Sequence, residues 1–250
     1  AADATAFFAE LVPRLQALVA DFDAAHNDVR LSQCGDGTTH ELSRKQCTTV
    51  LAFSFFSLFR QQRHFPRRNF SRLFHASRHP HGAVQKIKMF VHYFRRALAG
   101  DYESKRSVTF WRQTSASAAV EWAACHRPLS TARVFEERTI ESFAAAAHVD
   151  FANKYLGGGV LGSGAVQEEI MFAVTPELVA VGVVAERMAS DEAIVIRSAE
   201  TMSKYDGYRN TLRFAGDFRH RHVDSTVVIA IDAIYFESGA AAAEQFQRRL

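Results

Sequence analysis

Residues 149–172, VDFANKYLGGGVLGSGAVQEEIMF, decide the fold and the candidate site of this 250-residue chain. An apolar strand pattern leads into a glycine-rich run, and Gln167, Glu168 and Glu169 then open an amphipathic segment. Glycines adopt positive φ readily and carry no side chain, so their backbone N–H groups can approach an anionic ligand. Two adjacent carboxylates would repel a phosphate bound beside them. The pattern therefore favours a ligand whose reacting bond lies one sugar away from its phosphates.

Two phosphate-binding templates fit this run poorly. Gly157, Gly159 and Gly162 match the G-x-G-x-x-G spacing. The dinucleotide template also needs its helix to begin within the glycines and an acidic residue at the end of the next strand, whereas the next predicted strand ends in Arg197. The P-loop template needs Gly-Lys-Ser or Gly-Lys-Thr, but alanine follows Gly164. The sequence argues against P-loop nucleotide hydrolysis.

The acidic residues of this stretch have two interpretations. Glutamates in the first turn of a helix commonly just complement the macrodipole. Because successive helix residues diverge by about 100°, a functional pair would divide its work between the reacting centre and a sugar hydroxyl. Burial among apolar neighbours would raise the pKa of a carboxyl group, as a general acid requires. Asp150, on the opposite face from Val149 and Phe151, either bonds the backbone at the strand end or belongs to the site.

Composition bounds the class of protein. With 48% hydrophobic residues, the chain can bury one core, or one core plus a smaller helical unit. No apolar run approaches the roughly 18 residues of a membrane span, and no signal pattern precedes the first helix, so we expect a nuclear or cytoplasmic protein that is not secreted. Cys34, Cys47 and Cys125 are too few and too widely spaced for a disulfide framework or a Cys-x-x-Cys zinc site. The first residue is Ala1, which suggests a piece of a longer protein.

Charge is distributed unevenly. Residues 42–100 contain twelve Lys and Arg and no Asp or Glu. Such a block favours polyanions, and its aromatic residues could stack on bases; residues 44–96 could even bind nucleic acid. The simpler alternative makes these rings the core of a helical unit and the arginines its solvated face. The rings are Phe65, Phe70, Phe74, Phe90, Tyr93 and Phe94.

Periodicity predicts helices first and a sheet later. Leu11, Leu15 and Leu18 share one helical face, a capping box at Ser43 and Gln46 precedes a second helix, and residues 83–98 form a third, with residues 61–82 as a connection. From about residue 104, strand-like runs occur at 108–111, 132–135, 148–151, 193–196 and 227–234. Strands alternating with helices indicate a mixed α/β sheet covered on both faces, with ligands at the carboxyl ends of strands.

VDFAN, GGGVLGSG and QEEIMF, in this order, resemble the signature of the poly(ADP-ribose) glycohydrolase family. The likeness covers nearly the whole chain, including LSRKQCTTVLAFSFF, PRRNFSRLF, KIKMFVHYFRR, VTFWRQ, EWAACHRPL and ERTIE upstream, and TPELVA, YDGY and VVIAIDAIYF downstream. It implies an all-helical accessory region over residues 1–104 and a macrodomain-like mixed sheet flanked by helices, as an incomplete catalytic domain, over 105–250. The implied activity is hydrolysis of ribose–ribose bonds in poly(ADP-ribose), releasing ADP-ribose. We expect no cofactor and no metal.

The resemblance also assigns roles to residues. It implies that Glu169 is the catalytic acid/base, that Glu168 forms hydrogen bonds with ribose hydroxyls, and that Asp150 supports the site. Expected substrate contacts are Ile140 and Glu141 at the adenine, Tyr208 stacked on it, and Asn153, Gly158, Gly159 and Gln167 at ribose or nucleotide. An exposed tyrosine in a turn such as Tyr-Asp-Gly-Tyr is equally often incidental. The implied partners are the polymer and poly(ADP-ribosyl)ated proteins in the DNA damage response, with no membrane, no required nucleic acid and a monomeric state.

One departure from the family matters. The family's second diphosphate loop, with Asn-Trp-Gly and Phe-Gly-Gly, follows the strand that corresponds to residues 227–235. In this chain the two tryptophans, Trp111 and Trp122, come before that strand, and the sequence reaches Leu250 without such a loop. The alternative function is therefore a module that binds poly(ADP-ribose) or ADP-ribose without hydrolysing it.

Overall fold

The computed structural model describes residues 2–24, 37–60, 63–76, 80–114, 124, 126–143, 145–219 and 223–233. Its helices are α1 (Ala2–Ala24), α2 (Arg44–Phe55), α3 (Ser71–Phe74), α4 (Pro80–Leu98), α5 (Gln167–Val174) and α6 (Val181–Val184). Short 3-10 turns are η2 (Ile140–Ser142), η3 (Pro176–Ala180), η4 (Arg209–Thr211) and η5 (Val223–Ser225). The strands are β1 (Thr39–Leu42), β2 (Val108–Thr114), β3 (Ala147–Ala152), β4 (Glu192–Arg197), β5 (Ser203–Asp206), β6 (Arg213–Asp217) and β7 (Val227–Asp232).

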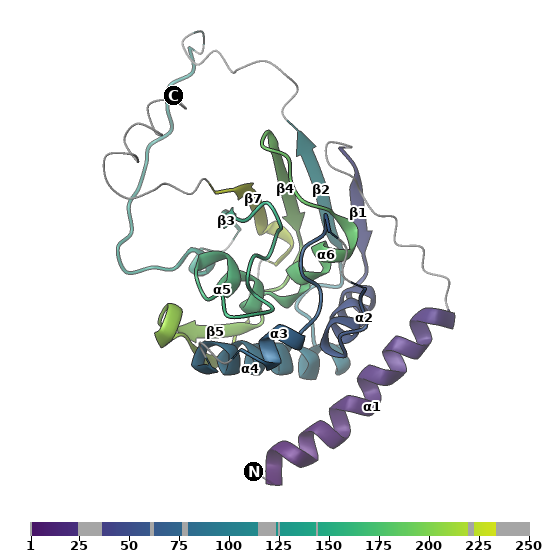
Figure 1. Ribbon diagram of the computed structural model, residues 1–250. Helices are drawn as coiled ribbons and strands as arrows, with labels where there is room; N and C mark the ends of the chain where they lie inside the picture. Colours follow the sequence, from purple (N-terminus) through teal and green to yellow (C-terminus); the bar gives the residue numbers. More distant parts are fainter. Residues whose placement is uncertain are drawn as a thin grey trace.

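A mixed five-stranded sheet forms the centre of the molecule, in the order β1-β2-β4-β7-β3 (Figure 1). β3 and β7 are parallel, and the other neighbours are antiparallel. β5 and β6 form a separate antiparallel hairpin. The predicted mixed sheet is confirmed. Because β3 and β7 run in the same direction, their carboxyl ends lie at the same end of the sheet, where the glycine-rich loop begins.

Two sequence predictions about strands are wrong. Residues 132–135 form no strand, and Val134 is 88% exposed; an apolar run without a neighbouring strand has no ladder to join. Conversely, the all-helical region over residues 1–104 contains β1, which pairs with β2 from Thr39↔Trp111 to Leu42↔Val108. The sequence analysis did not predict β1, because three of its four residues are polar, as is common for an edge strand.

The sheet buries one face. Phe110, Ile194 and Ala230 are buried on it, with α2 packed on β1 and α5 on β3. On the opposite face, Trp111 is 38% exposed and Phe151 is 62% exposed. The prediction that helices cover both faces is therefore wrong for the described residues. Alternating burial of this kind is typical of antiparallel pairing.

The helical predictions are confirmed in most details. The capping box forms as predicted, because the backbone N–H of Gln46 donates to Ser43 Oγ at 3.2 Å and that of Ser43 to Gln46 Oε1 at 2.8 Å. In α1, Leu11 and Leu15 are buried. The predicted connection over 61–82 contains the short α3, and α4 begins at Pro80. Among the described residues, no helix has the length and apolarity to span a bilayer.

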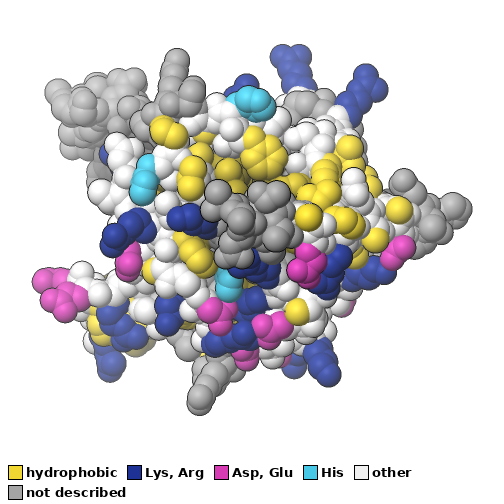
Figure 2. All heavy atoms as spheres, turned by 90° about the horizontal axis from the view of Figure 1, so that it is seen from below, with side chains coloured by type: hydrophobic (Ala, Val, Ile, Leu, Met, Phe, Trp, Pro, Cys, Tyr) yellow, Lys and Arg dark blue, Asp and Glu magenta, His cyan; other side chains and the backbone are white. Residues whose placement is uncertain are grey.

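Several members of the basic block are buried. Arg44 pairs with Glu177, Arg96 donates to Glu200 at 2.7 Å, and Lys86 is fully buried. The predicted solvated face of arginines is thus wrong for these residues, whereas the predicted aromatic core is confirmed for the four buried rings Phe70, Phe90, Tyr93 and Phe94. On the lower half of the face shown in Figure 2, Lys and Arg side chains lie among Asp and Glu side chains.

Candidate active site

A cleft of about 720 Å³ opens at the carboxyl ends of β3 and β7. Ala152 and Asn153 reach it from β3, and Ala233 reaches it from the end of β7. The remaining wall comes from β3 and the segment after it, from the glycine loop (residues 157–164), from the start of α5 and the residue before it, and from the N-terminal part of the chain. These residues are Arg63, Phe65, Arg67, Phe151, Tyr155, Gly158, Gly159, Val166, Glu168 and Glu169. Both parallel strands end in this cleft, where the sequence analysis expected a ligand to bind, and the site itself stays a prediction.

Gly158 is the point at which the two glutamates meet the loop. Its φ is +48°, a conformation that favours glycine. A Cβ atom added at Gly158 would lie 2.5 Å from Glu168 Oε2 and 2.7 Å from Glu169 Oε1. Only a residue without a side chain lets both carboxyl groups come this close to the backbone of the cleft.

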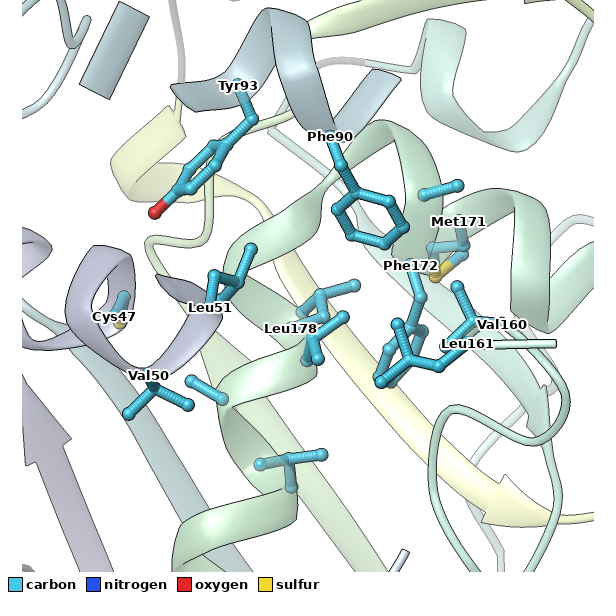
Figure 3. Packing of buried hydrophobic residues seen from close by; sticks show 14 of the residues in the cluster. Cys47, Val50, Leu51, Phe90, Tyr93, Val160, Leu161, Met171, Phe172 and Leu178 are labelled. Atoms are coloured by element: carbon cyan, nitrogen blue, oxygen red, sulfur yellow. The ribbon is translucent and has the colours of Figure 1, made fainter. Parts of the chain in front are cut away.

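The glycine loop is fixed from below by the hydrophobic core and by Lys86. Val160 and Leu161 of the loop lie in the core near Phe172 (Figure 3). Lys86 Nζ, from α4, donates to the carbonyl oxygen of Gly162 at 2.8 Å and also to that of Gly164. Burial lowers the pKa of Lys86 to about 8, and the charge of Glu169 opposes this shift. The loop is therefore anchored both by apolar packing and by the hydrogen bonds of Lys86.

Both glutamates are oriented by backbone N–H groups. Glu168 Oε1 accepts from Gly157 at 2.7 Å and Oε2 from Asn153 at 3.1 Å. Glu169 Oε1 accepts from Gly159 at 2.9 Å and Oε2 from Val166 at 2.9 Å. The hydrogen bond from the N–H of Val166 caps the N-terminus of α5. Glu169 therefore also has the structural role that glutamates in a first helical turn commonly have. It coexists with the placement of both carboxyl groups in the cleft.

Asp150 completes a cluster of three carboxyl groups. It is fully buried on β3, and neither of its carboxylate oxygens has a hydrogen-bond partner among the described residues. Burial and then the charge of Glu169 raise the pKa of Asp150 to about 7. Burial, followed by the charge of Asp150, raises the pKa of Glu168 to about 9, despite two backbone hydrogen bonds that lower it. Glu168 therefore keeps its proton at neutral pH, and Asp150 is partly protonated there.

A second, smaller cavity of about 200 Å³ lies at Glu141. Tyr205 also lines it, and its hydroxyl donates to Glu141 Oε2 at 3.3 Å. Ile140 is half-buried and packs on the core. Tyr208 is 48% exposed, with the Arg209 guanidinium 5.9 Å from its ring centroid. Tyr205, the first tyrosine of the Tyr-Asp-Gly-Tyr turn, therefore contacts Glu141, one of the predicted adenine contacts, and the sequence analysis did not single it out.

Gln167 is engaged by the backbone of β3. Its Oε1 accepts from the N–H of Phe151 at 3.0 Å, and its Nε2 donates to the carbonyl oxygen of Val149 at 3.1 Å. Among the described residues that line the cleft, Gln167 is absent. Its predicted substrate contact stays a prediction.

The sequence analysis also missed the contributions of Arg63, Arg67 and Lys86, because a basic block gives no signal of which members face a cleft.

No group of three or more His, Cys, Asp or Glu residues suited to a metal ion occurs in the described part of the chain.

The fold and site define an α/β protein with a carboxylate-lined cleft at the carboxyl ends of two parallel strands. Family models agree with this class. Residues 1–112 match the helical domain of poly(ADP-ribose) glycohydrolase, and residues 119–250 match its macro domain fold. The chain belongs to the poly(ADP-ribose) glycohydrolase family.

Curated relatives carry the same family name. The chain is 37% identical to poly(ADP-ribose) glycohydrolase 1 of Arabidopsis thaliana, over 77% of this chain and 37% of the relative. It is 34% identical to poly(ADP-ribose) glycohydrolase 1 of Caenorhabditis elegans, over 81% of this chain and 27% of the relative. A probable poly(ADP-ribose) glycohydrolase 2 of Arabidopsis thaliana is 32% identical, over 91% and 51%. The chain therefore spans about half or less of the length of these relatives.

Proposed function

We propose that the protein to which this chain belongs hydrolyses ribose–ribose O-glycosidic bonds of poly(ADP-ribose) and releases ADP-ribose. The observation that supports this most is the meeting of Glu168 and Glu169 at Gly158, inside a cleft at the carboxyl ends of β3 and β7. Adjacent glutamates on one helix turn do not form the facing pair of ordinary glycosidases. One principal acid/base is the mechanism that suits this geometry.

Glu169 is the proposed acid/base. It protonates the departing ribose oxygen as the glycosidic C–O bond breaks and positive charge develops on the other ribose. The Glu169 carboxylate that results then takes a proton from the water molecule that attacks the anomeric carbon of this second ribose. This proton transfer regenerates the acid. Backbone N–H groups of Gly159 and Val166 hold the carboxyl group in place throughout, so little reorganisation accompanies the proton transfer.

Glu168 has a different proposed task. With a pKa of about 9, it is a neutral acid at pH 7, and it donates a hydrogen bond to a ribose hydroxyl while adding no charge that would repel the phosphates. Asp150 supports the site from beneath. Asn153, Gly158, Gly159 and Gln167 are proposed to contact ribose or nucleotide. Ile140, Glu141 and Tyr208 are proposed to hold the adenine, with Tyr205 positioning Glu141 through the bond already described.

The test uses the full-length protein and measures ADP-ribose released from poly(ADP-ribose), together with polymer binding. Glu169→Gln should lower turnover by about 10²- to 10⁴-fold, the range for a general acid/base, while binding is retained. Glu168→Gln keeps a neutral side chain of the same shape, so its loss of turnover should be smaller. Binding without product release by the unmodified protein would refute the function. A larger loss in Glu168→Gln than in Glu169→Gln would refute the division of roles.

We also propose that the protein acts as a monomer in the nucleus or cytoplasm, on polymer attached to proteins in the DNA damage response, without requiring nucleic acid. Family membership supports the polymer as the substrate in this proposal. Size-exclusion chromatography of the full-length protein and its distribution in fractionated cells test it.

A further inference from the structure

One wall of the carboxylate cleft comes from the N-terminal part of the chain. Arg63, Phe65 and Arg67 line the same cleft as Glu168 and Glu169. Both arginines are exposed. Their guanidinium groups are therefore available to a ligand in the cleft, although they lie about 100 residues before the glutamates in the sequence.

The segment that carries these arginines is fixed to the protein. Residues 65–68 alternate in burial, so Pro66 and Arg68 face inward while Arg67 faces outward. The guanidinium of Arg68 donates to the carbonyl oxygen of Arg60 at 2.7 Å and lies 5.2 Å from the ring centroid of Phe65. Arg68 thus holds the ring that separates the two exposed arginines.

Two further contacts fix both ends of the segment. The Asn69 side chain donates to the carbonyl oxygen of Phe59 at 2.7 Å and accepts from its N–H at 3.1 Å, which joins Asn69 to the end of the segment that follows α2. Near the tip, the N–H of Arg187 donates to the carbonyl oxygen of His64 at 2.8 Å. The described residues 63–69, which carry Arg63 and Arg67, are consequently held by contacts near both of their ends, and this reduces the entropy lost when a ligand binds.

The arginines form a positive cluster that the described carboxylates leave unneutralised. In the described part of the chain, Arg63, Arg67 and Arg72 have no carboxylate within 4.0 Å. Burial and the charge of Arg72 lower the pKa of Arg67. Arg72 also borders the glycine loop, since its Cβ would lie 4.0 Å from a Cβ added at Gly162. Clustered like charges without a counter-ion are stabilised when an anion binds.

The carboxyl groups and the guanidinium groups that line the cleft therefore do not pair with each other. The carboxyl groups of Glu168 and Glu169 are bonded to backbone N–H groups and do not pair with the arginines. A ligand that suits this distribution has a neutral sugar at the carboxyl groups and an anionic group some distance away. A guanidinium is also well matched to phosphate, because its planar fork can donate two parallel hydrogen bonds.

We propose that Arg63 and Arg67 form a phosphate-binding rim of the cleft, which holds the diphosphate of an ADP-ribose unit beside the scissile ribose–ribose bond. The proposal rests on the proposed function and adds a substrate subsite that the helical region supplies. The diphosphate could belong to the released unit or to the next unit of the chain. Monomeric ADP-ribose and the polymer distinguish these two sources.

The test compares Arg63→Gln/Arg67→Gln with Lys88→Gln/Lys105→Gln in the full-length protein. The control removes the same charge from two exposed residues that do not line the cleft. Dissociation constants for ADP-ribose and for poly(ADP-ribose) are measured directly at two salt concentrations, and KM and kcat for ADP-ribose release are measured in parallel. The thermal midpoint of each variant checks folding.

We expect the arginine variant to bind about 10-fold more weakly at low salt, with a smaller salt dependence, a higher KM and kcat nearly unchanged. Weaker binding of ADP-ribose assigns the diphosphate to the released unit, and weaker binding of the polymer alone assigns it to the next unit. Equal affinities in the arginine and control variants would overturn the proposal, even if the protein hydrolyses the polymer. The dissociation constants for the polymer are measured with Glu169→Gln added to each variant, so that the polymer is not consumed, and a failure of the proposed function is recorded separately by the turnover assay.

Discussion

Gly158 combines two constraints in one residue, namely a positive φ and direct contact with two carboxyl groups. Gly158→Ala should therefore displace Glu168 and Glu169 as well as strain the backbone. We expect at least a 10²-fold loss of ADP-ribose release, since misplacement of catalytic groups by about 1 Å has an effect of this size. The loss of stability should be about 1–2 kcal/mol.

Gly100→Ala is the matched control for Gly158→Ala. Gly100 has φ +68°, and a Cβ added to it meets nothing within 4 Å. This variant should lose stability through backbone strain alone and keep its activity. If Gly158→Ala releases ADP-ribose as fast as Gly100→Ala, the contact with the carboxyl groups has no catalytic importance.

Asp150 makes stability depend on pH in an unusual direction. Its folded pKa is about 7, above its ordinary value of 3.8, and that of Glu168 is also raised. At these two groups the folded state therefore binds protons more tightly than the unfolded state, and their contribution to the free energy of unfolding should fall as pH rises from about 4 to about 9. Asp150→Asn should flatten this decline below pH 7, measured as the thermal midpoint against pH. The exposed Asp191→Asn should not change the profile.

At the scale of elements, α4 supports the glycine loop through its buried face. Lys86→Met would leave the carbonyl oxygens of Gly162 and Gly164 without their donor. Buried acceptors without partners cost about 1–3 kcal/mol, so we expect a loss of stability in that range and a lower kcat as the loop loosens. Lys88→Met, at an exposed position on the same helix, should match the wild type. Equal urea midpoints for the two variants would contradict this role of Lys86.

Helices and strands with strong apolar periodicity could be predicted from the sequence, and contacts between distant charged groups could not. The run at 193–196 became β4 because its apolar residues alternate inward, and Ser43 with Gln46 caps α2 through purely local bonds. Lys86 lies in a basic block where every member looks solvated. Its burial depends on carbonyl oxygens more than 70 residues later in the chain, which no local pattern encodes.

The same distinction applies to the candidate site. The order of glycines and glutamates predicted the loop, the first turn of α5 and the cleft at the end of β3, because these are neighbours in sequence. Arg63 and Arg67 reach the cleft through the packing of their loop near Gly182 of α6, where a Cβ added to the glycine would lie 3.1 Å from Arg68 Cγ. That approach is a property of the assembled fold.

At the scale of the molecule, the helical and sheet regions share one hydrophobic core. Leu15, Leu51 and Phe90 from the first hundred residues belong to the same buried cluster as Phe172 and Ile194. The boundary near residue 104 stays a prediction about sequence organisation. Deletion of residues 1–104 from the full-length protein should expose this apolar surface and prevent cooperative unfolding, measured by circular dichroism during heating. A sharp transition in the deleted protein would show that the sheet region folds independently.

The engagement of Gln167 by β3 has a consequence for solubility. β3 is the outermost strand of the described sheet, and an outermost strand offers its free N–H and C=O groups to any extended chain that meets it. The amide of Gln167 occupies the N–H of Phe151 and the carbonyl of Val149 much as a neighbouring strand would. The N–H of Phe151 and the carbonyl oxygen of Val149 are therefore not available for hydrogen bonds to a second molecule, although the ring of Phe151 beside them is exposed. One side chain thus shields the rim of the cleft from intermolecular β-pairing.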